Sequence, residues 1–316
     1  MTLSVTQLQL QLEAWQRIMQ ADPSATLIQQ ASASSVSFQL SNINLSGWRS
    51  GPSDPTPVLC LHGWLDNANS FLPLASAMST QSLLAVDLAG QGLSSHRSPD
   101  AHYYLFDYVA DLVELIQQQS WSKLHIIGHS MGGMVATALA AAMPELVARL
   151  VLVDSLGFVT TAPEDTAIQL RKALQSRQGR LQKHKPKYET VQQAAAARQN
   201  QSDFTLQEAL LLTQRGSCLL NGSSASITWS ADLRLRELSA QRLTIAQATA
   251  LIGQLQCPVM AIMAEDGIEL IQQNLALYQS SYPQLQLQHL AGGHHLHMTN
   301  ASAVAAAISQ FFQQAE

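Results

Sequence analysis

One short segment, Leu124 to Gly133, sets the strongest limit on what this chain can fold into. An apolar and β-branched run is followed there by the pattern Gly128-x-Ser130-x-Gly132. Such a run is typical of a buried parallel strand, and the Ala-, Met- and Leu-rich segment Met131–Ala142 is typical of a packed helix. The two glycines allow the strand and the helix to approach closely. The sharp turn between them would therefore push Ser130 out above the edge of a sheet.

The helix predicted after Ser130 would place hydrogen-bond donors beside this serine. The first N–H groups of a helix have no partner within it and lie at the positive end of its dipole. Negative charge that develops on a group next to Ser130 would be stabilised there. The alternative is a structural Gly-rich turn in which the serine has no role. The strand before it and the helix after it favour the chemical interpretation.

The size and charge of the chain narrow the class of protein. Its 316 residues suit one large α/β domain with an insertion, or two small domains. The hydrophobic share is 47% and the charged share 12%, which indicates a globular protein. A net charge of −5 and a pI of about 6.0 imply no basic face, so we expect neither nucleic acid nor an anionic membrane as partner. No stretch approaches the ~20 apolar residues of a membrane span.

The cysteines and the start of the chain bear on localisation. Cys60, Cys218 and Cys257 are odd in number and far apart, and they lack C-x-x-C spacing. This pattern indicates reduced, structural thiols. The first residues, Met1–Ser4, contain no Lys or Arg and lead into no apolar core, unlike a secretory signal. We therefore expect a cytoplasmic protein. Its oligomeric state has no signature in the sequence.

Strands and helices alternate along most of the chain. A leading helix is predicted over residues 5–20, and a hairpin of edge strands over Val36–Leu40 and Ile43–Trp48. The further predicted strands are Val58–Leu61, Leu83–Val86, Leu124–Ile127, Leu150–Val153, Pro258–Met263 and Leu285–Leu290. With helices between them, they predict a mostly parallel sheet covered by helices on both faces. Active sites in such sheets lie beyond the carboxyl ends of the strands.

The alternation stops between residues 156 and 256. This stretch is rich in Ala, Gln, Leu and Arg, and we expect helices and no buried strand in it. Its basic run, Lys183–Lys187, is interpreted as a solvated loop. An insertion of this size between two strands of the sheet is best interpreted as a lid over the active edge. We therefore divide the chain into the first part of the core (residues 1–155), a helical lid (156–256) and the second part of the core (257–316).

Several motifs stand at the predicted strand ends. They are His62-Gly63-Trp64, Asp87-x-x-Gly90-x-Gly92-x-Ser94, Gly128–Gly133 and Gly292-Gly293-His294. In this order they resemble the α/β-hydrolase fold. Four segments within the fold resemble its serine hydrolase-like subgroup. They are His62–Asn67, Val153–Phe158, Leu212–Gly216 and His294–His297. The segment Asp87–Ser94 is interpreted as a tight structural turn.

The resemblance assigns roles to individual groups. A serine hydroxyl is a poor nucleophile and needs a base within hydrogen-bond reach. The base of this family corresponds to His294, which directly follows Gly293. An oxyanion needs aimed N–H donors, and the amides of Met131 and Trp64 are the candidates. His62 and His129 are interpreted as structural residues that orient these loops.

Two other histidines, His295 and His297, follow His294 closely. They could be packing residues or metal-type ligands. No Asp, Glu or Cys stands near them at ligand spacing, so we expect no metal site. The serine chemistry that the resemblance implies needs no cofactor either.

The acid that orients His294 has more than one candidate. The family's usual position, after the strand that ends near Met263, falls on Gly267. Asp266 is one residue early, and Glu265 is a further neighbour. The other known position is the end of the strand after the nucleophile helix, where Asp154 stands; a structural role at the start of the lid is its alternative. We favour Asp154 and keep Asp266 as the alternative acid.

A serine at position 130 points to attack on a carbonyl carbon and to an acyl-enzyme. Relatives that open epoxides or remove halides place a carboxylate at this position. The predicted function is therefore hydrolysis of a carboxylic ester or thioester, with a small-molecule acyl substrate. Two alternatives remain open. One is a carbon–carbon bond hydrolase or perhydrolase that uses the same residues, and the other is a non-catalytic scaffold that binds a small molecule.

Overall fold

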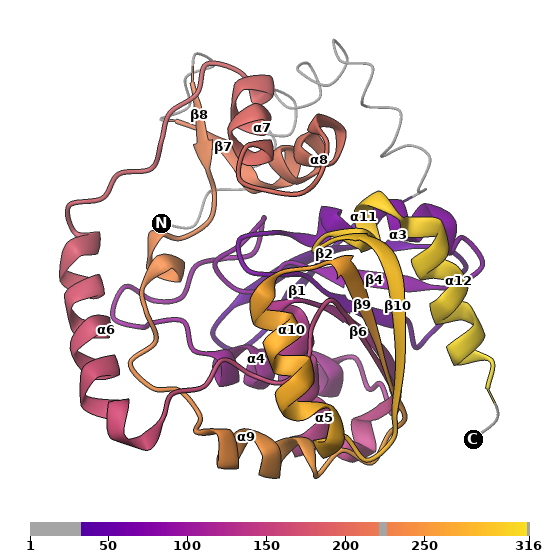
Figure 1. Cartoon of the computed structure of the whole chain (residues 1–316). Coiled ribbons are helices and arrows are strands. Elements are labelled where there is room, and N and C mark those ends of the chain that lie inside the picture. The colour runs from indigo at the N-terminus through magenta and orange to yellow at the C-terminus, as the bar shows by residue number, and fades with distance from the viewer. Residues whose placement is uncertain (1–32, 221–225, 315–316) are drawn as a thin grey trace.

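An eight-stranded sheet runs through the described part of the chain, residues 33–220 and 226–314 of a computed structural model (Figure 1). The strand order is β1-β2-β4-β3-β5-β6-β9-β10. These strands are β1 (Ser34–Gln39), β2 (Asn44–Ser50), β3 (Val58–Leu61), β4 (Leu83–Val86), β5 (Leu124–His129), β6 (Val147–Val153), β9 (Val259–Asp266) and β10 (Leu285–Gly293). The helix predicted over residues 5–20 lies outside the described residues.

The pairing confirms the predicted sheet. Strands β1 and β2 form an antiparallel hairpin at one edge, and β2 also runs antiparallel to β4. All further neighbours in the sheet are parallel. The strands after β2 end at a common carboxyl edge because each returns through a helix, and this edge carries the motifs named above.

Helices cover both faces of the sheet, as predicted. Successive strand residues alternate between two cores, so that Ile126 packs into one and Ile127 into the other. One core contains residues of α4 (Leu105–Gln118), α5 (Met131–Ala142), α9 (Ile245–Ile252) and α10 (Glu269–Tyr278). The other contains residues of α3 (Leu72–Ala77), α11 (Leu296–Thr299) and α12 (Ala301–Phe312). In Figure 1, α3 and α12 lie together on one side of the sheet.

The segment between β6 and β9 forms a separate group of elements. It contains α6 (Thr166–Arg180), α7 (Val191–Gln199), α8 (Leu206–Gly216), β7 (Ser217–Leu219) and β8 (Ile227–Trp229). Figure 1 shows α7, α8 and the two short strands stacked above the body that holds the sheet, with α6 along one side. This group has its own apolar core, which includes Val191, Phe204 and Ile227, and Met298 of α11 joins it.

The prediction that residues 156–256 contain no strand is wrong. Strands β7 and β8 pair in antiparallel fashion, and Ile227 and Thr228 are buried. Each strand is three residues long, which is too short for the alternation that identifies a strand in a sequence.

No helix in the described ranges combines the length and the apolar character that crossing a membrane requires.

Candidate active site

Ser130 stands in the turn between β5 and α5, at the carboxyl edge of the sheet. Its φ of 50° and ψ of −119° form a conformation that residues other than glycine rarely adopt. Small neighbours make the turn possible. A Cβ at Gly128 would lie 2.6 Å from the Cα of Gly133, and a Cβ at Gly132 would lie 2.1 Å from the carbonyl oxygen of Leu61. The strand, turn and helix predicted around Ser130 are confirmed, and such strain at a polar residue is typical of functional sites.

The side chains of Ser130, His294 and Asp154 form a continuous hydrogen-bonded row. The Nε2 atom of His294 lies 3.0 Å from Ser130 Oγ. Its Nδ1 atom lies 2.6 Å from Asp154 Oδ2. With a proton on Nδ1, the ring donates to the carboxylate and accepts from the serine hydroxyl. A ring held in this tautomer can take the hydroxyl proton when Ser130 attacks.

Asp154 reaches His294 from the end of β6, the strand next to β5. Its φ of 38° marks a second sharp turn, and its carboxylate is 2% exposed. The amide of Ala264, in β9, donates to Asp154 Oδ1 at 3.1 Å. One carboxylate oxygen is therefore held by the sheet, and the other is left for the imidazole.

The alternative acid, Asp266, is exposed at the end of β9, and within the described residues it makes no hydrogen bond to His294. The next residue, Gly267, explains the arrangement. A Cβ at Gly267 would lie 2.7 Å from Asp154 Oδ1 and 3.1 Å from Oδ2. The usual family position of the acid and the Asp154 carboxylate therefore occupy the same space. The structure brings Asp154, and not Asp266, to His294.

The two amides predicted to bind an oxyanion belong to Met131, directly after Ser130, and to Trp64, which lines the same cavity as Ser130. The Met131 amide is the first N–H of α5, so the helix itself offers it no acceptor. Trp64 follows β3, and the amide of the next residue, Leu65, donates to Gln91 Oε1 at 2.6 Å. The Trp64 side chain is 48% exposed, and its Nε1 donates to the carbonyl oxygen of Leu235 at 3.0 Å. The use of these amides as an oxyanion hole stays a prediction.

Two buried histidines hold the loops of this site. The Nδ1–H of His62 donates to the carbonyl oxygen of Gly63, and its Nε2 accepts from the Leu88 amide. His129 donates from Nε2 to the carbonyl oxygen of His294 at 2.9 Å. Burial lowers the pKa of both rings, so both are neutral at pH 7. These contacts agree with the expectation that His62 and His129 are structural residues that orient the loops.

His295 lies between two carboxylates, an arrangement that the sequence did not predict. Its ring Nδ1 bonds to Asp203, and its Nε2 lies 3.4 Å from Asp66 Oδ2. Burial alone would lower the pKa of His295, but the hydrogen bonds to Asp203 and Asp66 outweigh it and raise the pKa to about 9. Arg198 of α7 also pairs with Asp66, at 2.7 Å. His295 is thus a buried cation that joins the loop after β3 to the segment between β6 and β9.

His297, in contrast, is a packing residue. It is fully buried against Phe71 and the ring of His129. Burial lowers its pKa to about 3, so it is neutral.

Two of the motifs that carry the resemblance meet in a buried ion pair. The Nε atom of Arg215, in α8, lies 2.9 Å and 2.8 Å from the two oxygens of Asp87. Asp87 also accepts from the amides of Ala68 and Leu93. A Cβ at Gly92 would lie 2.2 Å from Asp87 Cγ, which explains the glycine there. The turn after β4 is structural, as predicted, and it anchors α8 to the core.

A cavity of about 720 Å³ opens onto Ser130 and His294. Its walls come from the loop after β3, from the end of β5 and from the segment between β6 and β9. The larger apolar side chains of the wall are Trp64, Leu65, Tyr188, Leu212, Trp229, Leu233 and Ile268. The space is ample for a small-molecule substrate with one end at Ser130.

The basic run Lys183–Lys187 is a loop whose residues are exposed except for Lys185, as expected, but part of it also faces the cavity. Lys183, His184 and Lys185 line this cavity. Lys185 is half-buried, and its Nζ donates to the Ser230 carbonyl oxygen at 3.1 Å. A charge run in the sequence does not reveal which other segment it faces in the fold.

Comparison with known proteins gives consistent matches over most of the chain. The family model for the alpha/beta hydrolase fold matches residues 56–301. A serine hydrolase-like protein of Danio rerio is 30% identical over 280 residues, which cover 83% of this chain and 83% of the relative. Serine hydrolase-like protein 2 of Homo sapiens is 31% identical over 295 residues, covering 81% and 87%.

Solved structures with the same fold support the family that the sequence matches indicate. A hypothetical protein from Pseudomonas aeruginosa PAO1 superposes with a TM-score of 0.82 at 37% identity, covering 89% of this chain and 99% of that one. A thioesterase domain from the curacin biosynthetic pathway superposes with a TM-score of 0.75 at 25% identity, covering 88% and 99%. With the sheet and turns described above, these matches show that the chain belongs to the α/β-hydrolase fold family, among its serine hydrolase-like members.

Proposed function

We propose that this protein is a serine hydrolase that cleaves a carboxylic ester or thioester through an acyl-enzyme. Ser130 is the nucleophile, His294 the general base and Asp154 the acid that orients it. The observation that carries the proposal is the hydrogen-bonded row of these three side chains, with Ser130 strained above the first turn of α5. A serine in such a row is activated for attack on a carbonyl carbon.

In the first half of the reaction, Ser130 Oγ bonds to the substrate carbonyl carbon while its proton passes to His294 Nε2. The carboxylate of Asp154 accepts from Nδ1–H and stabilises the imidazolium that forms. The amides of Met131 and Trp64 donate to the oxyanion of the tetrahedral intermediate. His294 then returns the proton to the alkoxide or thiolate that leaves.

In the second half, a water molecule attacks the carbonyl carbon of the acyl group that is bound to Ser130 Oγ. His294 accepts a proton from the water, and the same two amides bind the second oxyanion. Collapse of this intermediate releases the carboxylic acid and returns the proton to Ser130 Oγ. The chain supplies every proton-transfer group that this sequence of steps requires.

Residues 156–256 act as a lid in this proposal. Their support is the cavity, since Lys183, Tyr188, Arg198, Trp229 and Arg236 of this segment line it together with Ser130. The lid is anchored to the core by the Asp87–Arg215 pair and by His295. We expect it to determine which acyl or leaving group fits.

A cytoplasmic location also belongs to this proposal. The three cysteines are free thiols, and two of them, Cys60 and Cys257, are buried. Reduced thiols are typical of proteins that work in a reducing compartment.

A panel of p-nitrophenyl esters of increasing acyl length tests the proposal. The wild-type protein should hydrolyse at least part of the panel, and Ser130→Ala should lose at least ~10³-fold in kcat while keeping its fold. Ser76→Ala, which removes an exposed hydroxyl from α3, is the matched control and should keep wild-type turnover. Retention of more than a few per cent of activity by Ser130→Ala would rule out this nucleophile. A folded wild-type protein without turnover would favour the scaffold.

A further inference from the structure

The charges around the cavity differ in sign from those of the whole protein. The chain carries a net charge of −5. The cavity that holds Ser130 is nevertheless lined by five cationic side chains, and by two carboxylates, Asp66 and Asp232. The cationic side chains are Lys183, Lys185, Arg198, Arg236 and the protonated His295. A local excess of cations on an acidic protein indicates a function that needs them there.

Both carboxylates of the cavity wall are already neutralised by other groups. Asp66 pairs with Arg198 at 2.7 Å and with His295 at 3.4 Å. Asp232 pairs with Arg234 at 2.6 Å. This pairing uses the charges of Arg198 and His295 but leaves those of Lys183, Lys185 and Arg236 without a carboxylate partner.

No carboxylate of the described ranges lies within ion-pair distance of Lys183, Lys185 or Arg236. At Lys185 the lack of a paired carboxylate destabilises the charged form of the side chain. Burial lowers the pKa of its ammonium group, and the charge of Asp232 only partly opposes the effect. An anion in the cavity would restore the charge stabilisation that this ammonium group has lost.

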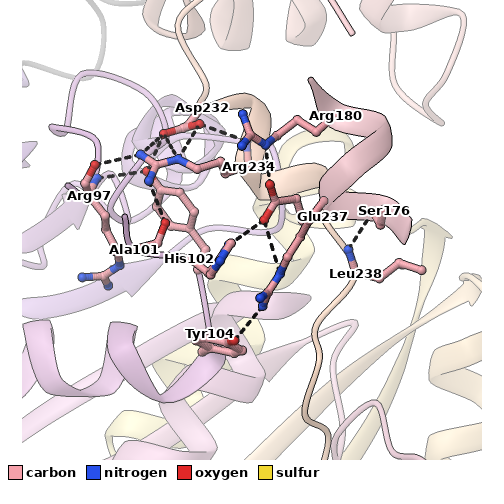
Figure 2. A network of polar contacts seen from close by, with 12 residues as sticks. Arg97, Ala101, His102, Tyr104, Ser176, Arg180, Asp232, Arg234, Glu237 and Leu238 are labelled. Atoms are coloured by element: carbon pink, nitrogen blue, oxygen red, sulfur yellow. Dashed lines mark hydrogen bonds and ion pairs between the residues drawn. The ribbon is translucent and has the colours of Figure 1, made fainter. Parts of the chain in front are cut away.

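The backbone at Arg236 is held in place by the residues on either side of it. Arg236 ends the short helix η4 (Leu233–Arg236), within a segment that we call the strap, residues 232–237. Figure 2 shows three strap side chains, Asp232, Arg234 and Glu237, in a polar network with neighbouring loops and with Arg180 of α6. Arg234 donates to the carbonyl oxygens of Arg97, Ser98 and Ala101, and Glu237 bonds to Arg180 and, at 2.7 Å, to His102.

These contacts anchor the strap on both sides of Arg236, and Arg236 itself lines the cavity. Its guanidinium carbon lies 5.8 Å from the ring centroid of Trp64. Trp64 is tied to the same strap through its hydrogen bond to the Leu235 carbonyl oxygen. An exposed cation, carried on an anchored backbone, therefore stands beside the loop that we propose for the oxyanion.

We infer that the substrate is an anionic ester or thioester, whose carboxylate or phosphate group binds between Arg236 and the lysines 183 and 185 while its acyl carbon lies at Ser130. This inference rests on the proposed function and adds the class of substrate. The apolar wall near Leu212 and Trp229 receives the uncharged part of the molecule. Guanidinium and ammonium groups are the usual protein donors to carboxylate and phosphate oxygens.

Matched pairs of esters test this substrate class. Butyryl esters of 4-hydroxybenzoate and of 4-hydroxyphenyl phosphate carry the anion on the leaving group, and the butyryl ester of methyl 4-hydroxybenzoate is their neutral partner. The p-nitrophenyl ester of glutarate carries it on the acyl group, and p-nitrophenyl pentanoate is its neutral partner. We expect kcat/KM to favour at least one anionic ester over its partner, mainly through a lower KM. The preference should shrink in about 0.5 M salt.

Removal of the cations should remove this preference. Arg236→Gln, Lys183→Gln and Lys185→Gln should each lower the anionic-to-neutral ratio of kcat/KM by about three- to fivefold, as is typical of ion pairs near the surface. Lys172→Gln is the matched control, because this exposed lysine of α6 lies outside the cavity lining. It should leave the ratio unchanged. A wild-type protein that hydrolyses neutral esters and never prefers the anionic partner would overturn the inference and leave the proposed function standing.

Calorimetric binding of the same esters to Ser130→Ala separates the two proposals. Binding of an anionic ester that weakens in Arg236→Gln/Ser130→Ala would support the inference even if the wild-type protein showed no turnover. Equal binding of anionic and neutral esters would contradict it.

Discussion

Raising the pH should weaken the folded state through one buried side chain, His295. In the folded protein this ring lies between Asp203 and Asp66, and its pKa is about 9. In the unfolded chain the pKa returns to its usual value of 6.5. A proton bound more tightly in the folded state stabilises that state. The contribution is complete below pH 6.5 and is lost as the pH rises to about 9.

The difference between the two pKa values sets the size of the effect. Each pKa unit corresponds to about 1.4 kcal/mol, so the shift of His295 amounts to about 3 kcal/mol of unfolding free energy. Between pH 6.5 and 9 the folded state holds one more proton at this site than the unfolded state. The free energy of unfolding should therefore fall by about 1.4 kcal/mol per pH unit in this range from His295 alone.

Urea unfolding followed by tryptophan fluorescence between about pH 6 and 10 would measure this slope. Other groups also titrate in this range, so His295→Gln serves as the reference protein. Subtracting its curve from the wild-type curve isolates the contribution of His295. Two parallel curves would refute the reasoning, because they would mean that His295 binds its proton no more tightly in the folded protein.

Three further substitutions test the structure of the site. Asp154→Asn should lower kcat by about 10³- to 10⁴-fold with little change in KM, because the imidazole loses its orienting carboxylate. The matched change Asp266→Asn should leave ester turnover near normal. The reverse result would make Asp266 the acid. Gly267→Ala should lower kcat by about tenfold or more, because its Cβ would stand 2.7 Å from Asp154 Oδ1 and displace the carboxylate. Gly179→Ala, which meets nothing within 4 Å, is its control, and equal activity of the two variants would contradict the argument. Arg215→Met should lower the free energy of unfolding by about 3–5 kcal/mol, as it leaves Asp87 buried without its cation, and a urea midpoint near that of wild type would contradict this.

The features of the fold that depend on local sequence were predictable. The strand, turn and helix around Ser130 follow from an apolar run, closely spaced glycines and an Ala-rich segment that stand next to one another. The hairpin β1–β2 follows from alternation over residues 36–48. The strands β7 and β8 were missed, since three residues each are too few to show a period.

The features that depend on distant contacts were not predictable. His295 and Asp203 are 92 residues apart in the chain, and nothing around Asp203 marks it as a partner. The choice between Asp154 and Asp266 depends on how two turns meet at the carboxyl edge. Gly267 is the sequence feature that relates to this choice, because a glycine at the usual position of the acid leaves space for a carboxylate from the neighbouring strand. That reason is visible only when both turns are placed in space.

Covalent labelling of Ser130 tests the central claim most directly. The folded protein would be treated with a fluorophosphonate, digested, and analysed by mass spectrometry, with Ser130→Ala and His294→Asn as comparisons. A phosphonate reacts with a serine only where a base and an oxyanion site activate it. We predict a single adduct on the peptide that contains Ser130, no adduct in Ser130→Ala, and much slower labelling in His294→Asn. An adduct on another residue, or none on the folded wild-type protein, would contradict the account of this site.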